Sequence, residues 1–209
     1  MSSAEHISVV ILAAGSAQRM GQLKQVLPDD DGVPLVVRAF ELACAVAVSD
    51  EHPIASVNIV TGHDDARVRA CFDVDKNVKT RDHVELAFVH NPDYASGMGS
   101  SLEVGIRAAK EQGASCALVL LADQPLVRPR DLAALIEGAR KEDVAVAAAL
   151  YDEVLGAPAC FTSPCFDVLI ERASSTRGGA RALLRSGALG QVLGVSMAHA
   201  AFDLDTPED

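Results

Sequence analysis

A short, near-continuous apolar run near the start of the chain, Ile7–Leu12, sets the strongest limit on its fold. A strand that is apolar on both faces is typical of a parallel sheet with helices covering both sides. The run passes directly into a loop of small residues, 13–17, and such a loop lets backbone N–H groups approach an anion closely. The segment therefore predicts an α/β fold with an anion-binding loop after its first strand.

The rest of the chain alternates apolar runs with amphipathic segments. We expect strands at 7–12, 55–61, 84–90, 116–121, 144–150, 156–162 and 192–197. We expect helices from Pro34 onward and at 63–72, 101–112, 129–140, 166–173 and 179–186. Such alternation favours parallel strands joined by right-handed crossovers. We predict one domain over residues 1–209, a three-layer α/β/α sandwich around a mostly parallel twisted sheet.

Composition narrows the class of protein. Hydrophobic residues make up 49% and charged residues 22%, which indicates a globular chain. The net charge of −11 disfavours nucleic acid as a partner, because phosphate contacts need a basic face. No signal-peptide pattern and no long apolar stretch is found, so we expect no membrane association.

The number and spacing of the cysteines indicate the cellular compartment of the protein. There are five, an odd number without any C-x-x-C spacing, and most lie in apolar runs: Cys44, Cys71, Cys116, Cys160 and Cys165. This pattern favours reduced core thiols in a cytoplasmic protein.

Three loops are expected to meet at the carboxyl ends of the strands, where open parallel sheets bind their ligands. In the first, Arg19 and Lys24 follow the small residues Ala13–Gly15 and can pair with phosphate oxygens. The loop lacks G-x-x-x-x-G-K-[ST] and G-x-G-x-x-G, which disfavours a P-loop and an NAD-type fold. The alternative is a tight strand-to-helix turn with solvated cations.

The second and third loops carry further candidates. Gly97, Gly99, Ser100 and Ser101 precede a predicted helix, whose N-terminus offers N–H groups to a base or ribose; the alternative is ordinary N-capping by a serine. Asp123 directly follows an apolar strand and suits Mg²⁺, which takes one or two carboxylates beside phosphate oxygens. The alternative for Asp123 is a helix cap or turn.

The acidic C-terminal segment could add a second metal ligand. Asp205 is the first choice and Asp203 the second. The alternative is a solvated tail.

Taken together, these residues resemble the signature of the nucleotidyltransferase family that includes the molybdenum cofactor guanylyl- and cytidylyltransferases. The resemblance spans nearly the whole chain and implies a Rossmann-like nucleotidyltransferase fold. In chain order it rests on Leu12-Ala13-Ala14-Gly15, Arg19-Met20-Gly21, Lys24, Asn91-Pro92, Gly97-Met98, Ser101-Leu102, Leu121-Ala122-Asp123-Gln124-Pro125, Gly156-x-Pro158, Gly179-Ala180-Arg181-Ala182-Leu183-Leu184 and the segment 203–209.

Within the family, Ala13-Ala14 stands where guanylyltransferases typically have glycines, which favours CTP. The chain departs from the usual pattern at Ala157, at Thr176-Arg177-Gly178 and at Gln25-Val26, where Leu-Leu is usual. The first two departures lie where the acceptor substrate is expected. The sequence motifs therefore say less about the identity of the acceptor than about the nucleotide.

The resemblance implies Mg²⁺-dependent transfer of CMP from CTP to the terminal phosphate of molybdopterin, the molybdenum cofactor precursor, with Mn²⁺ as an alternative ion. Its implied catalytic residues are Arg19, Lys24 and Asp123, and its metal ligands are Asp123 and Asp205. Its implied nucleotide site comprises Leu12, Ala13, Ala14, Gly15, Arg19, Lys24, Gly97, Ser100 and Ser101. Its implied acceptor site comprises Gln124, Pro125, Gly156, Pro158 and Arg181.

Expected partners are these small molecules and a molybdoenzyme or its chaperone. Two alternatives remain open. One is a nucleotidyltransferase acting on a sugar or polyol phosphate. The other is a non-catalytic chaperone that binds nucleotide or cofactor for a molybdoenzyme, against which the combination of Arg19, Lys24 and Asp123 argues.

Overall fold

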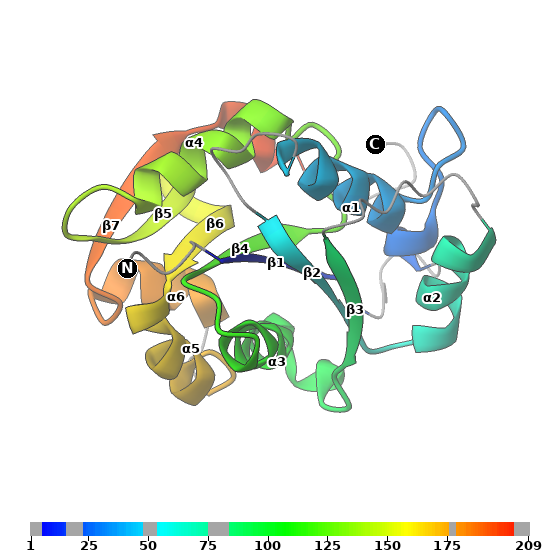
Figure 1. Ribbon diagram of the computed structural model, residues 1–209, viewed down its shortest axis with the longest axis horizontal. Helices are drawn as coiled ribbons and strands as arrows, with labels where there is room; N and C mark the ends of the chain where they lie inside the picture. The colour runs from blue at the N-terminus through cyan, green and yellow to red at the C-terminus, as the bar shows by residue number, and fades with distance from the viewer. Residues whose placement is uncertain (1–5, 16–22, 48–53, 75–83, 176–178, 203–209) are drawn as a thin grey trace.

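A seven-stranded twisted sheet runs through the middle of the protein (Figure 1). The structure is a computed structural model that describes residues 6–15, 23–47, 54–74, 84–175 and 179–202. Strand order is β3-β2-β1-β4-β6-β5-β7, with the first strand of the chain near the centre. The strands are β1 Ile7–Leu12, β2 Ile54–Thr61, β3 Glu85–His90, β4 Cys116–Leu121, β5 Val144–Tyr151, β6 Val154–Thr162 and β7 Gln191–Ser196.

Helices cover both faces of the sheet, as expected (Figure 1). They are α1 Leu35–Val46, α2 Asp65–Val74, α3 Met98–Glu111, α4 Pro129–Ala139, α5 Phe166–Arg172 and α6 Gly179–Ser186. Four short 3-10 helices join them: η1 Lys24–Val26, η2 Tyr94–Ser96, η3 Ser163–Cys165 and η4 Ala198–Ala201. One buried apolar cluster lies under α1, α2 and α4, and a second lies under α3, α5 and α6. The predicted mostly parallel α/β/α sandwich is confirmed.

β6 is the exception to the parallel pairing that the alternation predicts. It runs antiparallel to both β4 and β5, whereas the other described neighbours in the sheet are parallel. Only Asp152 and Glu153 separate β5 from β6, too few residues for a crossover, and both have positive φ, 49° and 61°. Two left-handed residues are what a tight hairpin turn requires. The hairpin brings the end of β5 and the start of β6 to the edge where β1 and β4 end.

α3 approaches the sheet closely because it carries glycine where it crosses β1. A Cβ on Gly105 would lie 2.3 Å from Val10 Cγ1 and 3.0 Å from Val60 Cγ2. A Cβ on Gly99 would lie 2.0 Å from the carbonyl oxygen of Ala173, just beyond α5. The two glycines therefore fix the distance from α3 to the sheet on one side and to the α5 segment on the other.

A buried polar cluster holds the C-terminal end of α3. Ser8 and Asn58, both fully buried, lie on β1 and β2. Ser56 Oγ and Asn58 Nδ2 donate to Gln112 Oε1 at 2.9 and 2.8 Å, and Asn58 Nδ2 also donates to Ser8 Oγ at 2.9 Å. Because these groups satisfy one another, the cluster fixes the register of α3 along the sheet.

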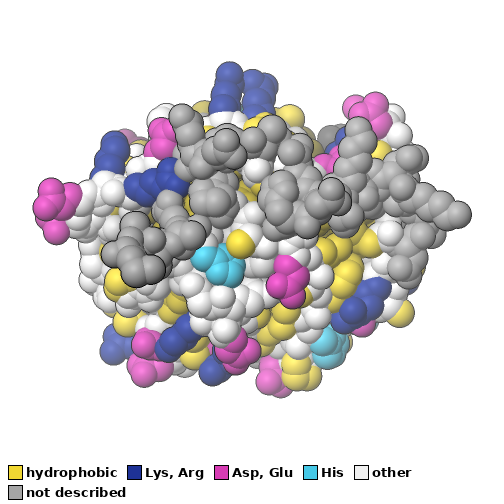
Figure 2. Space-filling view, viewed as in Figure 1, with side chains coloured by type: hydrophobic (Ala, Val, Ile, Leu, Met, Phe, Trp, Pro, Cys, Tyr) yellow, Lys and Arg dark blue, Asp and Glu magenta, His cyan; other side chains and the backbone are white. Residues whose placement is uncertain are grey.

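No disulfide joins the five cysteines, which all lie in the described part of the chain, and four of them are buried, as the sequence predicts. The exception, Cys71, is half-buried. Burial raises the pKa of the Cys71 and Cys165 thiols. Among the described residues no helix is long and apolar enough to cross a membrane. On the face seen in Figure 2, the described Lys and Arg side chains are interspersed with Asp and Glu.

Gly105→Ala tests the close approach of α3. The added methyl group would overlap Val10, so we expect a loss of unfolding free energy of about 1–3 kcal/mol by urea denaturation. The double variant Gly105→Ala/Val10→Ala should lose less than the sum of the single losses, because the shortened Val10 makes room. Strict additivity would contradict the contact.

Candidate active site

The loop after β1 is held by a buried glutamine. Gln25 Nε2 donates hydrogen bonds to the carbonyl oxygens of Ala13 and Gly15, both at 2.8 Å. The Ala13 N–H donates to Val60 O on β2 at 2.9 Å, so this amide is already used within the protein. Gln25, one of the departures from the family pattern, thus ties the loop to η1, the segment that carries Lys24. Sequence reasoning missed this role because the partners are backbone carbonyls.

The segment from η1 to α1 is closed into a compact loop. Leu35 N donates to Leu27 O at 2.9 Å. Arg38 of α1 pairs with Asp29, and with Asp31 at 2.6 Å. Burial acts to raise the pKa of Asp29, but hydrogen bonds from Arg38 and from the loop backbone outweigh it, so the pKa of this carboxyl falls below its ordinary value. These contacts fix η1 relative to α1.

Several predicted residues lie outside the described part of the chain. They are Arg19 of the first loop, Asp203 and Asp205 of the acidic tail, and the departure at 176–178. Lys24 is described, half-buried in η1.

The second loop is organised around Asn91. The helix begins at Met98, three residues before the predicted start, and its N-cap is Gly97 with φ 118°. Ser100 and Ser101 lie in the first turn and are buried, and their hydroxyls both accept hydrogen bonds from Asn91 Nδ2 at 3.0 Å. N-capping by either serine is therefore wrong, and the hydroxyls connect α3 to the end of β3.

In the third loop, which follows β4, the neighbouring residues Asp123 and Gln124 differ in burial and in their contacts. Asp123 follows β4 and is half-buried. Gln124 is buried, and its Nε2 donates to Ala157 O at 3.1 Å and Ala200 O at 2.8 Å. Gln124 therefore links the β4 loop to β6 and η4, and its amide nitrogen is used in that link.

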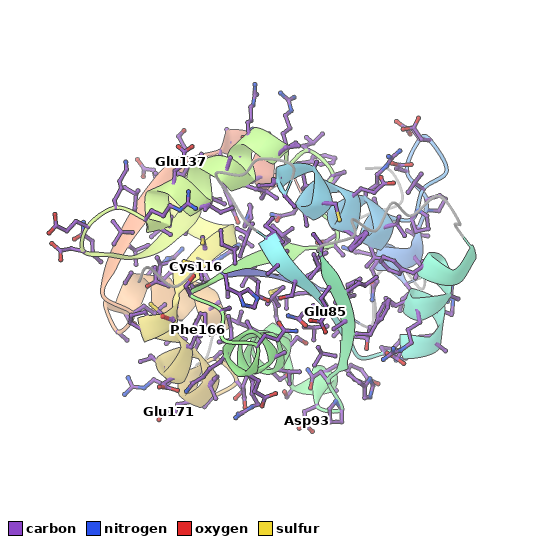
Figure 3. The ribbon with its side chains drawn as sticks, viewed as in Figure 1. Glu85, Asp93, Cys116, Glu137, Phe166 and Glu171 are labelled. Atoms are coloured by element: carbon purple, nitrogen blue, oxygen red, sulfur yellow. The ribbon has the colours of Figure 1, made fainter. Side chains whose placement is uncertain are left out.

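A cavity of about 660 Å³ opens where β1 and β4 end. It lies on the side of the sheet covered by α3, α5 and α6, the side on which Figure 3 labels the buried Phe166 of α5. Four predicted site residues line it: Leu12, Gly97, Gly156 and Arg181. Residues of the nucleotide and acceptor sets therefore share one cavity.

The other predicted acceptor residues lie elsewhere. Gln124, Pro125 and Pro158 line a smaller cavity of about 350 Å³, whose wall includes Leu35 and Ala39 of α1 on the opposite face of the sheet. The structure thus divides the acceptor set: Gly156 and Arg181 face one cavity, and these three face the other.

Among residues 6–15, 23–47, 54–74, 84–175 and 179–202 there is no cluster of three or more His, Cys, Asp or Glu that could hold a metal ion. This is compatible with Mg²⁺, which usually keeps water and phosphate oxygens as ligands beside one or two carboxylates. The assignment of Asp123 to this role stays a prediction.

The family profile described as "MobA-like NTP transferase domain" matches residues 9–192. The chain belongs to this family. As a member of it, the protein is a nucleotidyltransferase.

Individual relatives agree with this assignment. The chain is 30% identical to the purine catabolism protein PucB of Bacillus subtilis (strain 168), covering 96% of this chain and 92% of the relative. It is 26% identical to the molybdenum cofactor cytidylyltransferase of Escherichia coli (strain K12), covering 97% and 93%. A nucleotidyl transferase structure from Methanothermobacter thermautotroptrophicus superimposes with a TM-score of 0.75 at 21% identity, covering 97% and 93%, and shows the same fold.

Gln25→Leu tests the support of the first loop. It leaves two carbonyl oxygens, one of them on buried Ala13, without their donor, so we expect a loss of about 1–3 kcal/mol in unfolding free energy. The loop should also bind a nucleoside triphosphate more weakly by titration calorimetry. Gln25→Glu should behave similarly, because a carboxylate cannot donate. The control Gln191→Leu, exposed on β7, should change neither quantity.

The pH dependence of stability tests the Asp29–Arg38 pair. Because folding lowers the pKa of Asp29, its contribution is complete above the ordinary carboxyl range and is lost as pH falls through the lowered pKa. Unfolding free energy, measured by urea denaturation between about pH 5 and pH 2, should fall less steeply in Asp29→Asn than in wild type. Asp30→Asn, at an exposed position in the same loop, should keep the wild-type slope; an unchanged slope in Asp29→Asn would contradict the pairing.

Proposed function

We propose that the enzyme transfers CMP from CTP to the terminal phosphate of molybdopterin and releases pyrophosphate. The observation that supports this most is the shared cavity, in which Leu12 and Gly97 of the nucleotide set meet Gly156 and Arg181 of the acceptor set. Similarity to the Escherichia coli molybdenum cofactor cytidylyltransferase over 97% of the chain supports the reaction, and Ala13-Ala14 supports CTP.

The proposed step is a displacement at phosphorus. An oxygen of the acceptor phosphate forms a bond to the α-phosphorus of CTP, and the bond from that phosphorus to the bridging oxygen breaks. The electron pair leaves with pyrophosphate. Such a reaction depends on in-line positioning and charge stabilisation, and it needs no covalent enzyme intermediate. In this proposal Lys24 and Arg19 bind the triphosphate oxygens and stabilise the charge that builds up on the leaving group.

A divalent ion, Mg²⁺ or Mn²⁺, would be held by Asp123 together with Asp205. A carboxylate oxygen is the ligand type that Mg²⁺ prefers. When bound, the ion would neutralise charge on the substrate phosphates. Gln124, which bonds to Ala157 and Ala200, keeps the loop that carries Asp123 in place.

The first two loops have different tasks in this proposal. Ala14 and Gly15 present backbone to the nucleotide, while Gln25 holds the carbonyls of Ala13 and Gly15 away from it. Gly97 lines the cavity, and Ser100 and Ser101 act through Asn91 by fixing the start of α3. The product would pass to a molybdoenzyme or its chaperone in the cytoplasm, where thiols stay reduced.

Lys24→Ala and Asp123→Ala should each lower cytidylyl transfer by well over tenfold, because each removes a charge that acts on the phosphates. Pyrophosphate release from CTP, Mg²⁺ and molybdopterin measures the rate. Circular dichroism and the urea midpoint check that both variants fold. The control Lys141→Ala, at an exposed position after α4, should retain wild-type turnover, and wild-type turnover in both test variants would exclude the assignment.

The acceptor assay separates the alternatives. Molybdopterin and a panel of sugar and polyol phosphates are each offered with CTP, GTP or UTP, and pyrophosphate release is followed. We expect the highest kcat/KM for molybdopterin with CTP. Preference for a sugar phosphate would favour the second acceptor class. Tight CTP binding with no turnover on any acceptor would favour the cofactor chaperone.

A further inference from the structure

Two successive residues of η4 contact the two ends of the connection between β4 and α4, the connection that carries Asp123. At its start, Gln124 Nε2 donates to the carbonyl oxygen of Ala200 at 2.8 Å. Beyond its end, in the first turn of α4, Asp131 Oδ2 lies 2.7 Å from Nε2 of His199. η4 therefore holds the segment that presents Asp123 at both of its ends.

The contact between His199 and Asp131 is short and shielded from water. The side chain of Asp131 is 12% exposed and that of His199 is 31% exposed. A carboxylate oxygen accepts hydrogen bonds, so Nε2 of His199 is the donor. The same Oδ2 accepts the backbone N–H of Arg128 at 2.8 Å, which fixes the carboxylate at the start of α4. The imidazole therefore bonds to an acceptor whose position is already set.

η4 is a single turn, so its contacts with other elements decide how it is oriented. At its start, Met197 N donates to Leu150 O at the end of β5 at 2.9 Å. Ala200 is fully buried in the apolar cluster under α1, α2 and α4. Met197 thus fixes where the turn begins, and the bond from His199 fixes its rotation. The direction of the Ala200 carbonyl follows from both.

Two prolines limit the hydrogen bonds that the connection can make with itself. Pro125 and Pro129 lack a backbone N–H and cannot donate. Val127 N donates to Gln124 O at 3.4 Å, which is long for a backbone bond. Gln124 Nε2, by contrast, is buried and bonds to η4 at 2.8 Å. The position of Asp123, which precedes Gln124, therefore depends on η4 as well as on the connection itself.

We infer that His199 is a positioning residue for the transfer reaction. Its hydrogen bond to Asp131 orients η4. Through the Ala200 carbonyl, η4 then places Gln124 and its neighbour Asp123. The inference deepens the proposed function and rests on it, since Asp123 there holds the divalent ion. A residue that acts in this way changes the rate of the chemical step more than the binding of substrates, because the reaction depends on exact placement of charged groups.

His199→Ala and His199→Gln in the full chain test the positioning role. Glutamine can donate from its Nε2 to the carboxylate of Asp131, whereas alanine cannot. In the pyrophosphate-release assay, His199→Ala should lower kcat by about tenfold and change KM for CTP and acceptor by less than about twofold. His199→Gln should keep kcat within about threefold of wild type.

Two measurements need no turnover. Mn²⁺ binding in the presence of CTP is followed by loss of the free-Mn²⁺ EPR signal, with CTP alone as the reference. It should be about threefold to tenfold weaker in His199→Ala, because outer contacts of a ligand loop tune metal affinity. Amide hydrogen exchange over residues 122–128 should be faster in His199→Ala and close to the wild-type rate in His199→Gln.

Arg69→Ala is the control for a general loss of stability. Arg69 of α2 pairs with Asp65 at 2.8 Å and lies over the ring of Phe88, away from η4. Its removal should lower the urea midpoint but leave kcat, Mn²⁺ affinity and exchange over 122–128 at wild-type values. Equal effects of Arg69→Ala and His199→Ala would overturn the inference.

Asp131→Asn approaches the same contact from α4. Its amide oxygen can still accept the Arg128 N–H, so the start of α4 is kept while the charge is lost. We expect a smaller loss of kcat than in His199→Ala, and no further loss when the two changes are combined, because both act on one interaction. Losses that simply add would contradict the pairing.

The inference and the proposed function can fail separately. If His199→Ala weakens Mn²⁺ binding and speeds exchange over 122–128, but the wild-type protein converts no acceptor with any nucleotide, the positioning of Asp123 stands and the proposed transfer fails. If the wild-type protein converts molybdopterin and His199→Ala keeps its kcat and its Mn²⁺ affinity, the proposed function stands and the inference fails.

Discussion

The packing of α3 on the sheet is the constraint on which the rest of the site depends. Gly105 lets the helix lie directly on Val10 and Val60, and Gly99 brings its first turn against the Ala173 carbonyl. With a side chain at either position, the helix would have to move away from β1 or from α5. Since Leu102 of α3 flanks the large cavity, the depth and shape of that cavity follow from two missing side chains.

Backbone carbonyls, more than side-chain partners, organise the loops around the cavity. Gln25 binds the carbonyls of the first loop, and Gln124 binds those of Ala157 and Ala200. Both glutamines are buried, and a buried amide satisfies carbonyls that would otherwise lose their hydrogen bonds to water. Each glutamine therefore places a neighbour, Lys24 or Asp123, whose own side chain is only half-buried.

The elements were predictable from the sequence because apolar periodicity is a local signal, and the seven strands and six helices lie within a few residues of their expected bounds. The direction of β6 was not, because the turn Asp152-Glu153 lacks the glycine that usually marks such a hairpin. The sequence also did not predict that the expected acceptor residues line two separate cavities. Gly156 and Pro158 are two residues apart in sequence, yet they line cavities on opposite faces of the sheet.

The overall charge and the local charge of the site act in opposite directions. At −11 the protein repels polyanions at a distance, yet its substrates as a nucleotidyltransferase carry phosphates. Salt screens the long-range repulsion within about 10 Å, whereas a cation beside apolar walls acts through a medium that screens it less. Arg181 stands above such walls. The apolar lining therefore strengthens the attraction between the guanidinium and a phosphate that has entered the cavity.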